Sequence, residues 1–252
     1  FNHASQTVTL NRTSGTQVVG GSADTTFNNL THTTAALLQF GDATTGGRTF
    51  TVAGTFTWSG SNLTVGNAAL SDTLALTNSS LTIPTGLTLA TLNSSTVQIS
   101  GNWTRDGTYT ANSGTIRFQG TTQSILTTTT FSTLAIAVGS TTTMTVDVDV
   151  SSTLNVNGTL ALSDSRTLRL GTGAASGTAN VAGTLRTTSG VSSRPTITAV
   201  STSFRHDFNV TGTLDINGLL FRYANANGMD LQVGAAVTKL DYVAFTFIET
   251  SA

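Results

Sequence analysis

One short phrase recurs along the chain and constrains its fold more than any other feature. An apolar-x-apolar step leads into a small turn and then into a second apolar-x-apolar step. The copies are FTVAGTFTW at Phe50–Trp58, LNVNGTLAL at Leu154–Leu162, ANVAGTLRT at Ala179–Thr187, FNVTGTLDI at Phe208–Ile216 and the looser VQISGNWTR at Val97–Arg105. Alternation over three residues places both apolar side chains on one face of a strand. Each copy therefore predicts two very short strands around a glycine, which supplies backbone freedom for a corner.

Strands this short do not form a stable hairpin sheet on their own. Groups of three apolar-x-apolar steps recur about every 23 residues, so winding the chain lets each strand pair with its equivalent one turn later. We therefore predict an all-β fold, a β-solenoid of the right-handed parallel β-helix type, with about 23 residues per coil and about eleven coils. The alternative is an antiparallel β-sandwich, which needs longer strands. Only Leu134–Val138 and Met144–Val150 are long enough for it.

The composition also favours β-structure. Charged residues make up 9% of the chain, and Lys239 and Glu249 are its sole lysine and glutamate. Thr and Ser form about a third of the chain, and residues branched at Cβ prefer extended backbone. With 38% hydrophobic residues, the chain has enough apolar side chains for a substantial core.

A second, longer repeat indicates an internal duplication. TTFNNL at Thr25–Leu30 parallels TTFSTL at Thr129–Leu134, and flanking segments match in the same order. We expect a single solenoid domain, 1–252, in which a unit of about 105 residues is duplicated, at about 5–110 and about 111–215.

Charge and cysteine content limit the partners and the compartment. The net charge is −1 without an acidic or basic block, which argues against nucleic acid and against a polybasic membrane contact. No apolar run approaches the roughly 20 residues that span a bilayer, so membrane insertion is not expected. Phe1 opens the chain without Met or a charged leader, which suggests a mature or excised chain. Scarce Lys and Glu, abundant Thr and Asn and the absence of Cys together predict a secreted or cell-surface protein.

The two ends of the chain carry apolar strand residues without an amphipathic helix to cover them. Val8 and Leu10 form one such step near the N-terminus, and Val243, Phe245 and Phe247 continue another near the C-terminus. An exposed solenoid end leaves strand edges and core side chains uncovered. These five residues are therefore the candidate self-association site.

Two acidic positions invite a chemical reading. Asp147 and Asp149 alternate with valines in VDVDV, so their carboxylates could form a calcium site or an acid/base pair. They could also belong to an outward row of solvated polar residues, with the valines pointing inward. The outward row is favoured. His206 stands beside Asp207, but neighbours in a strand point to opposite faces and do not act together.

No other pattern predicts catalysis. Isolated arginines at 166, 169, 186 and 194 are too few for the charged groove of a lyase, and the Thr-rich stretches are too irregular for an ice-binding face. Motifs of the GxSxG, HExxH and P-loop types are missing from the sequence. We therefore expect neither an enzyme nor a cofactor or metal site.

Ser100–Ile125 reads SGNWTRDGTYTANSGTIRFQGTTQSI, in which a GNWT step is followed by a GTYT step and a GTIRF strand, and further coil-like segments lie between Ile216 and Phe247. These segments resemble the β-strand repeats of very large bacterial and archaeal cell-surface proteins, and Ser100–Ile125 is the most similar. The resemblance implies a parallel β-helix, export and an adhesive or structural role. It implies no shared catalytic residues.

The expected function is that of an extracellular structural β-solenoid that associates end to end into a fibre, sheath or surface layer. Its partners would be other copies of itself or adjoining solenoid segments. The alternative is an adhesin segment whose flank binds surface glycans or a host surface. The candidate stacking platforms for that role are the aromatic residues Trp58, Trp103, Tyr109 and Tyr223. Trp58 and Trp103 occupy apolar positions of the repeat, which favours burial in the core for these two.

Overall fold

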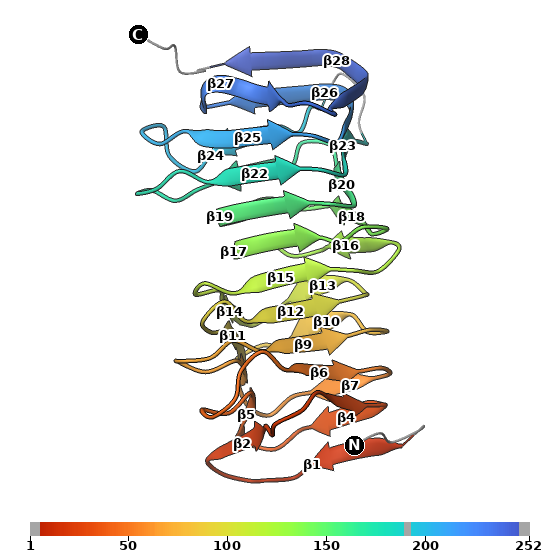
Figure 1. Ribbon diagram of the computed structural model, residues 1–252, viewed down its shortest axis with the longest axis vertical. Helices are drawn as coiled ribbons and strands as arrows, with labels where there is room; N and C mark the ends of the chain where they lie inside the picture. Colours follow the sequence, from red (N-terminus) through yellow and green to blue (C-terminus); the bar gives the residue numbers. More distant parts are fainter. Residues whose placement is uncertain (1–5, 189–192, 247–252) are drawn as a thin grey trace. The chain divides into compact units, whose positions relative to one another are not determined.

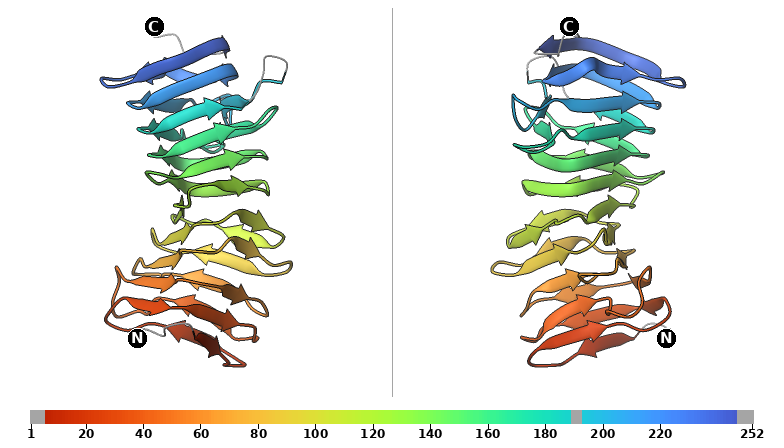
Figure 2. Two further views of the ribbon diagram at one scale, coloured as in Figure 1. Left: turned by 90° about the vertical axis from the view of Figure 1, so that its right-hand side faces the viewer. Right: turned by 60° about the vertical axis from the view of Figure 1, so that its left-hand side comes forward.

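The computed structural model describes residues 6–188 and 193–246. Within these residues every regular element is a β-strand, and parallel strands stack in about ten coils that lie about 23 residues apart. Figures 1 and 2 show the strands within each part of the chain stacked coil upon coil. The predicted β-solenoid is thus confirmed, and the antiparallel sandwich is excluded because neighbouring strands of the described residues pair in parallel.

The chain forms two compact units, residues 1–120 (unit 1) and 121–252 (unit 2). The strands of unit 1 are β1 (Thr7–Leu10), β2 (Thr16–Val19), β3 (Thr25–Phe27), β4 (Asn29–His32), β5 (Leu37–Phe40), β6 (Thr49–Val52), β7 (Phe56–Trp58), β8 (Leu63–Val65), β9 (Thr73–Leu76), β10 (Leu81–Ile83), β11 (Thr88–Thr91), β12 (Thr96–Ile99), β13 (Trp103–Arg105), β14 (Thr108–Thr110) and β15 (Thr115–Phe118). Its pairings form the columns β2-β5-β8-β11-β14 and β3-β6-β9-β12-β15 and, on the third side, β1-β4-β7 and β10-β13.

Unit 2 has longer strands, several of which run through a corner. They are β16 (Gln123–Ile125), β17 (Thr129–Ile136), β18 (Thr141–Met144), β19 (Val148–Val156), β20 (Thr159–Leu162), β21 (Thr167–Leu170), β22 (Thr178–Val181), β23 (Thr184–Thr187), β24 (Thr196–Ala199), β25 (His206–Val210), β26 (Thr213–Arg222), β27 (Ala224–Leu231) and β28 (Ala236–Thr246). One column runs β16-β18-β20-β23-β26-β28. β19 pairs with both β21 and β22, so its two halves belong to different faces of the coil.

The core is built from stacked apolar columns. In one of them Leu38 pairs with Leu63, Leu63 with Leu89 and Leu89 with Tyr109, and the three leucines are fully buried. Full burial of a leucine side chain stabilises the fold by roughly 1.5–3 kcal/mol. Because each coil repeats the pattern, burial of apolar side chains accounts for the choice of a solenoid over isolated short strands.

Outward positions carry polar rows, as the alternation predicts. An asparagine ladder is one example: the Asn180 side-chain amide donates to Asn155 Oδ1 at 3.1 Å, and that of Asn209 donates to Asn180 Oδ1 at 3.2 Å. These asparagines lie on the paired strands β19, β22 and β25 of successive coils.

The glycines of the repeated phrase serve close approach, and their expected role as flexible corners is wrong. Gly158, Gly183 and Gly212 are absent from the residues with positive φ. A Cβ on Gly183 would lie 2.0 Å from the Gly158 carbonyl oxygen, and one on Gly212 would lie 2.0 Å from that of Gly183. The stacked turns therefore leave no room for a side chain. Backbone bonds of 2.7 Å from Thr184 N to Gly158 O and from Thr213 N to Gly183 O hold them together.

Candidate functional site

Exposed apolar side chains gather on the last described coil. Among ten exposed large hydrophobic residues of the described chain, six lie between residues 231 and 245, so the exposure is concentrated rather than scattered. They are Leu231, Val233, Val237, Leu240, Tyr242 and Phe245. This concentration marks β27, β28 and the turn between them as the candidate binding surface, called here the β28 surface.

Several of these side chains occupy core positions. Val237, Leu240 and Phe245 pair with Leu214, Ile216 and Phe221, which are all fully buried in β26. On β28 the exposed fractions are 47% for Val237, 38% for Leu240 and 47% for Phe245. The apolar columns of unit 2 thus reach β28 and leave their final members in contact with solvent.

An aromatic stack runs into the same surface. The Phe208 and Phe221 rings lie 5.2 Å apart, centroid to centroid, and those of Phe221 and Phe245 lie 5.6 Å apart, in edge-to-face arrangements. A further aromatic or aliphatic side chain above Phe245 would extend this column in the same geometry.

The predicted end residues fall as follows. Val8 and Leu10 are half-buried on β1, which pairs with β4. Val243 is half-buried on β28, where Phe245 is about half exposed. Phe247 lies outside the described residues. Their role in self-association stays a prediction.

The acidic pair of VDVDV takes the outward position. Val148 and Val150 are fully buried, whereas Asp149 accepts a hydrogen bond from Arg169 Nε at 2.5 Å. Arg169 also lies 3.7 Å from Asp147, whose Oδ1 accepts from the Thr167 backbone N–H. The two carboxylates are thus oriented by one arginine on the next coil, and the described residues contain no group of three or more His, Cys, Asp and Glu side chains placed for a metal ion.

His206 and Asp207 point to opposite faces, as expected. The His206 ring is fully buried beside the rings of Phe208 and Phe221, and its Nε2 lies 3.0 Å from the Arg222 carbonyl oxygen, to which an Nε2–H donates. Burial lowers the pKa of His206 to about 4, against the weaker opposing effects of the Arg222 carbonyl and Asp207. His206 is thus part of the core of unit 2.

Most of the candidate stacking aromatics are unavailable to a ligand. Trp103 is fully buried, Trp58 is 7% exposed and Tyr109 is 9% exposed. Tyr223 is half-buried, with the guanidinium groups of Arg205 and Arg222 at 5.3 and 5.6 Å from its ring centroid. Three of the four expected platforms are therefore core or near-core residues.

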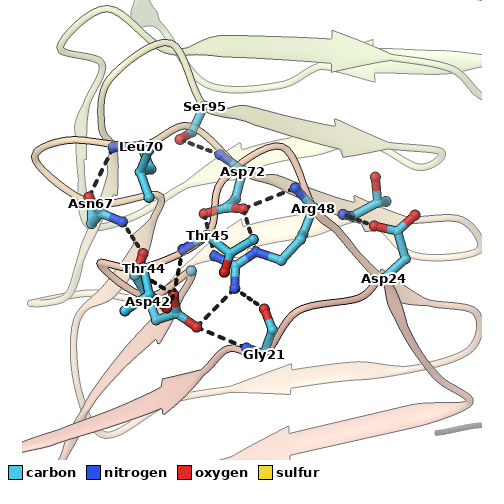
Figure 3. Close-up of polar contacts among 12 residues, drawn as sticks. Gly21, Asp24, Asp42, Thr44, Thr45, Arg48, Asn67, Leu70, Asp72 and Ser95 are labelled. Carbon is cyan, nitrogen blue, oxygen red and sulfur yellow. Dashed lines mark hydrogen bonds and ion pairs between the residues drawn. The ribbon is translucent and has the colours of Figure 1, made fainter.

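Sequence reasoning missed a buried ion-pair cluster in a corner of unit 1, shown in Figure 3. Arg48 precedes β6 and Asp72 precedes β9. Arg48 Nε donates to Asp72 Oδ1 at 3.1 Å and Nη2 to Oδ2 at 3.3 Å, while Nη1 donates to Asp42 Oδ2 at 2.9 Å and to the Gly21 carbonyl. The Asp72 backbone N–H donates to Ser95 Oγ at 3.0 Å, which brings in a further coil.

The charges of this cluster stabilise one another. Hydrogen bonds from the Thr44 hydroxyl, then from the Gly21 and Thr44 backbone N–H groups and from Arg48, hold the pKa of Asp42 well below its usual range. Burial by itself would lower the pKa of Arg48, but Asp72 and Asp42 outweigh it and raise that pKa. All three guanidinium nitrogens of Arg48 donate to protein oxygens, so the cluster ties neighbouring coils together as a structural clamp. Its one sequence signal is that Arg48 and Asp72 lie 24 residues apart, which is one coil.

A pocket of about 310 Å³ opens on the flank of unit 1 between β7 and β10. Its lining residues carry no ionisable side chain; they are Phe56, Thr57, Trp58, Ser80, Leu81, Thr82 and Pro84. No sequence pattern pointed to this position.

Within the described chain, no helix has the length and hydropathy needed to span a bilayer. Comparisons with protein-family models, with curated proteins and with solved structures give no match to this chain.

Proposed function

We propose that this chain is a non-enzymatic, extracellular structural β-solenoid that binds coil to coil, at its ends, to another copy of itself or to an adjoining solenoid segment. The observation that carries the proposal is the β28 surface. There, the apolar side chains that pair with buried core residues of β26 are themselves 38–47% exposed. Covering them with a further coil removes apolar area from water, at about 25 cal/mol per Å². It also pairs the outer edge of β28.

Association of this kind is heterologous, because the surface near β28 differs from that near β1. A head-to-tail contact that does not close into a ring produces an open filament. A fibre, sheath or surface layer follows from such growth. The scarcity of charged side chains, at 9% of the chain, leaves little like-charge repulsion between copies.

Sedimentation velocity of the purified 252-residue chain tests this contact. We expect the sedimentation coefficient to rise with protein concentration, and a Leu240→Asp/Phe245→Asp double variant to remain monomeric at the same concentrations. The matched control is Val138→Asp, which also places a carboxylate on an exposed valine of unit 2 but lies far from β28 in sequence. Circular dichroism melting confirms that the variants fold. A wild-type chain that stays monomeric at millimolar concentration, or a control variant that abolishes association equally, would contradict the proposal.

A further inference from the structure

Strand pairing in unit 1 is interrupted at one position on its flank. Strands of its inner coils pair on both edges: β8, for example, pairs with β5 and β11, and β9 pairs with β6 and β12. β7 and β10 occupy equivalent positions in successive coils, yet β7 pairs with β4, β10 pairs with β13, and no described pairing joins β7 to β10. Figure 1 shows these two strands one above the other.

The edge of β7 that faces β10 presents unused backbone groups. The Leu30 N–H donates to the Thr55 carbonyl at 3.0 Å, and the Ser59 N–H donates to the His32 carbonyl at 2.9 Å. In a parallel ladder, successive residues direct their N–H and C=O groups alternately to the two neighbouring strands. Since the residues of odd number bond to β4, Phe56 and Trp58 direct their backbone groups toward β10.

The same alternation applies to β10. The Leu81 N–H donates to the Asn102 carbonyl at 2.9 Å, and the Ile83 carbonyl accepts from the Asp106 N–H at 2.9 Å. The backbone groups of Leu81 and Ile83 therefore point toward β13, and Thr82 directs its N–H and C=O toward β7. Two strand edges thus face each other across the pocket.

The residue after β10 removes one donor from the edge that faces β7. One coil earlier, the Ser59 N–H closes the ladder onto the His32 carbonyl. Pro84 follows Ile83 as Ser59 follows Trp58, and proline has no N–H to donate to the Trp58 carbonyl. Proline is accordingly found at the edges of sheets rather than within them.

We propose that this flank pocket binds an extended, uncharged peptide segment of a partner protein, which adds to the β7 edge as a strand and contacts β10 on its other side. Three observations favour a peptide. The facing edges offer the alternating donors and acceptors that a strand satisfies by β-addition. The lining has no ionisable side chain, so the segment is held by backbone dipoles. Phe56 and Pro84, which are both half-buried, supply apolar contacts for its side chains.

Amide hydrogen exchange of the full chain tests this assignment. The probe is the acetylated and amidated decapeptide TTFNNLTHTT, which is residues 25–34 of this chain and contains β4, the strand that already pairs with β7. We expect the Phe56, Trp58 and Thr82 amides to exchange fast in the free protein and at least about tenfold more slowly with saturating peptide. Amides that are already protected in the free protein, or that the peptide leaves unchanged, would overturn the proposal.

A test variant and a matched control show whether the peptide binds in the pocket. Thr57→Trp fills the pocket from an exposed position on β7 and should weaken peptide binding at least tenfold, whereas Thr110→Trp, an exposed threonine on β14, should leave it unchanged. If circular dichroism shows that Thr57→Trp disturbs the fold, Thr82→Trp on the opposite wall replaces it.

A peptide N-methylated at alternate residues lacks the donors along one edge and should bind at least tenfold more weakly. Equal binding of that peptide would contradict strand addition. Protection of the same amides by maltohexaose, without an effect of the peptide, would identify a glycan groove and overturn the proposal. End-to-end association plays no part in this assay, so the two proposals fail independently.

Discussion

The guanidinium of Arg48 forms a buried fork with the carboxylate of Asp72, with 3.1 Å from Nε to Oδ1 and 3.3 Å from Nη2 to Oδ2. Both side chains are almost fully buried, and they belong to successive coils. Two parallel N–H···O bonds to one carboxylate add geometric specificity to the attraction between the charges. The pair therefore fixes the register of neighbouring coils through side chains, in addition to the backbone ladder.

Removing one partner of this pair should be costly. Arg48→Met leaves the Asp72 carboxylate buried without its cation, for which we expect a loss of about 3–5 kcal/mol in the free energy of unfolding. Arg169→Met is the control, because Arg169 pairs with Asp149 in a partly exposed position and should cost less than about 1 kcal/mol. Urea unfolding followed by circular dichroism measures both. Equal losses in the two variants would show that the corner cluster is no clamp.

The close stacking of turns predicts that replacing one glycine of unit 2 by alanine destabilises the fold much more than replacing another. Gly183→Ala places a Cβ 2.0 Å from the Gly158 carbonyl oxygen, so the turns must separate. We expect a loss of about 1–3 kcal/mol in the free energy of unfolding. A Cβ on Gly173 would have no neighbouring atom within 4 Å, so Gly173→Ala should be nearly neutral. Thermal melting of both variants checks this. A neutral Gly183→Ala would mean that the repeated glycine is not required for close stacking.

The buried imidazole of His206 predicts a pH dependence of stability. Its pKa is about 4 in the folded protein and about 6.5 in the unfolded chain, so between these values the unfolded chain binds more protons. The contribution of His206 to the free energy of unfolding should therefore be fully present above about pH 6.5. It should fall as the pH decreases toward 4, by on the order of 3 kcal/mol.

The His206→Gln variant isolates that contribution, since His3 and His32 remain in both proteins. Urea unfolding at intervals between pH 7 and pH 4 should show a shallower loss for the variant than for the wild type. Parallel curves over this range would exclude His206 as the source.

The coil architecture was predictable because its cause is local. Alternation in segments such as Phe50–Trp58 and a period of about 23 residues encode short strands with one buried face, and the structure confirms both. The reason for the repeated glycines was not predictable in the same way. Gly183 is constrained by the carbonyl of Gly158 one coil away, and a contact between coils has no mark in the local sequence.

The polar sites show the same limit. Arg48 and Asp72 are paired by the stacking of coils, and a single charged residue in each of two corner loops gives no motif. The gap between β7 and β10 has Pro84 in its lining, and the missing N–H of this proline has a consequence only once its place opposite Trp58 is known. The outward position of Asp149 could be predicted, because it follows from alternation with the buried Val148 and Val150.

Electron cryomicroscopy of the purified chain at a concentration where it associates is the most direct test of the end-to-end contact. We predict filaments in which β28 lies against a coil of the next copy and the strand spacing of about 4.8 Å continues through the junction. Discrete monomers at every concentration, or copies joined through their flanks with Leu240 and Phe245 still exposed, would contradict this account.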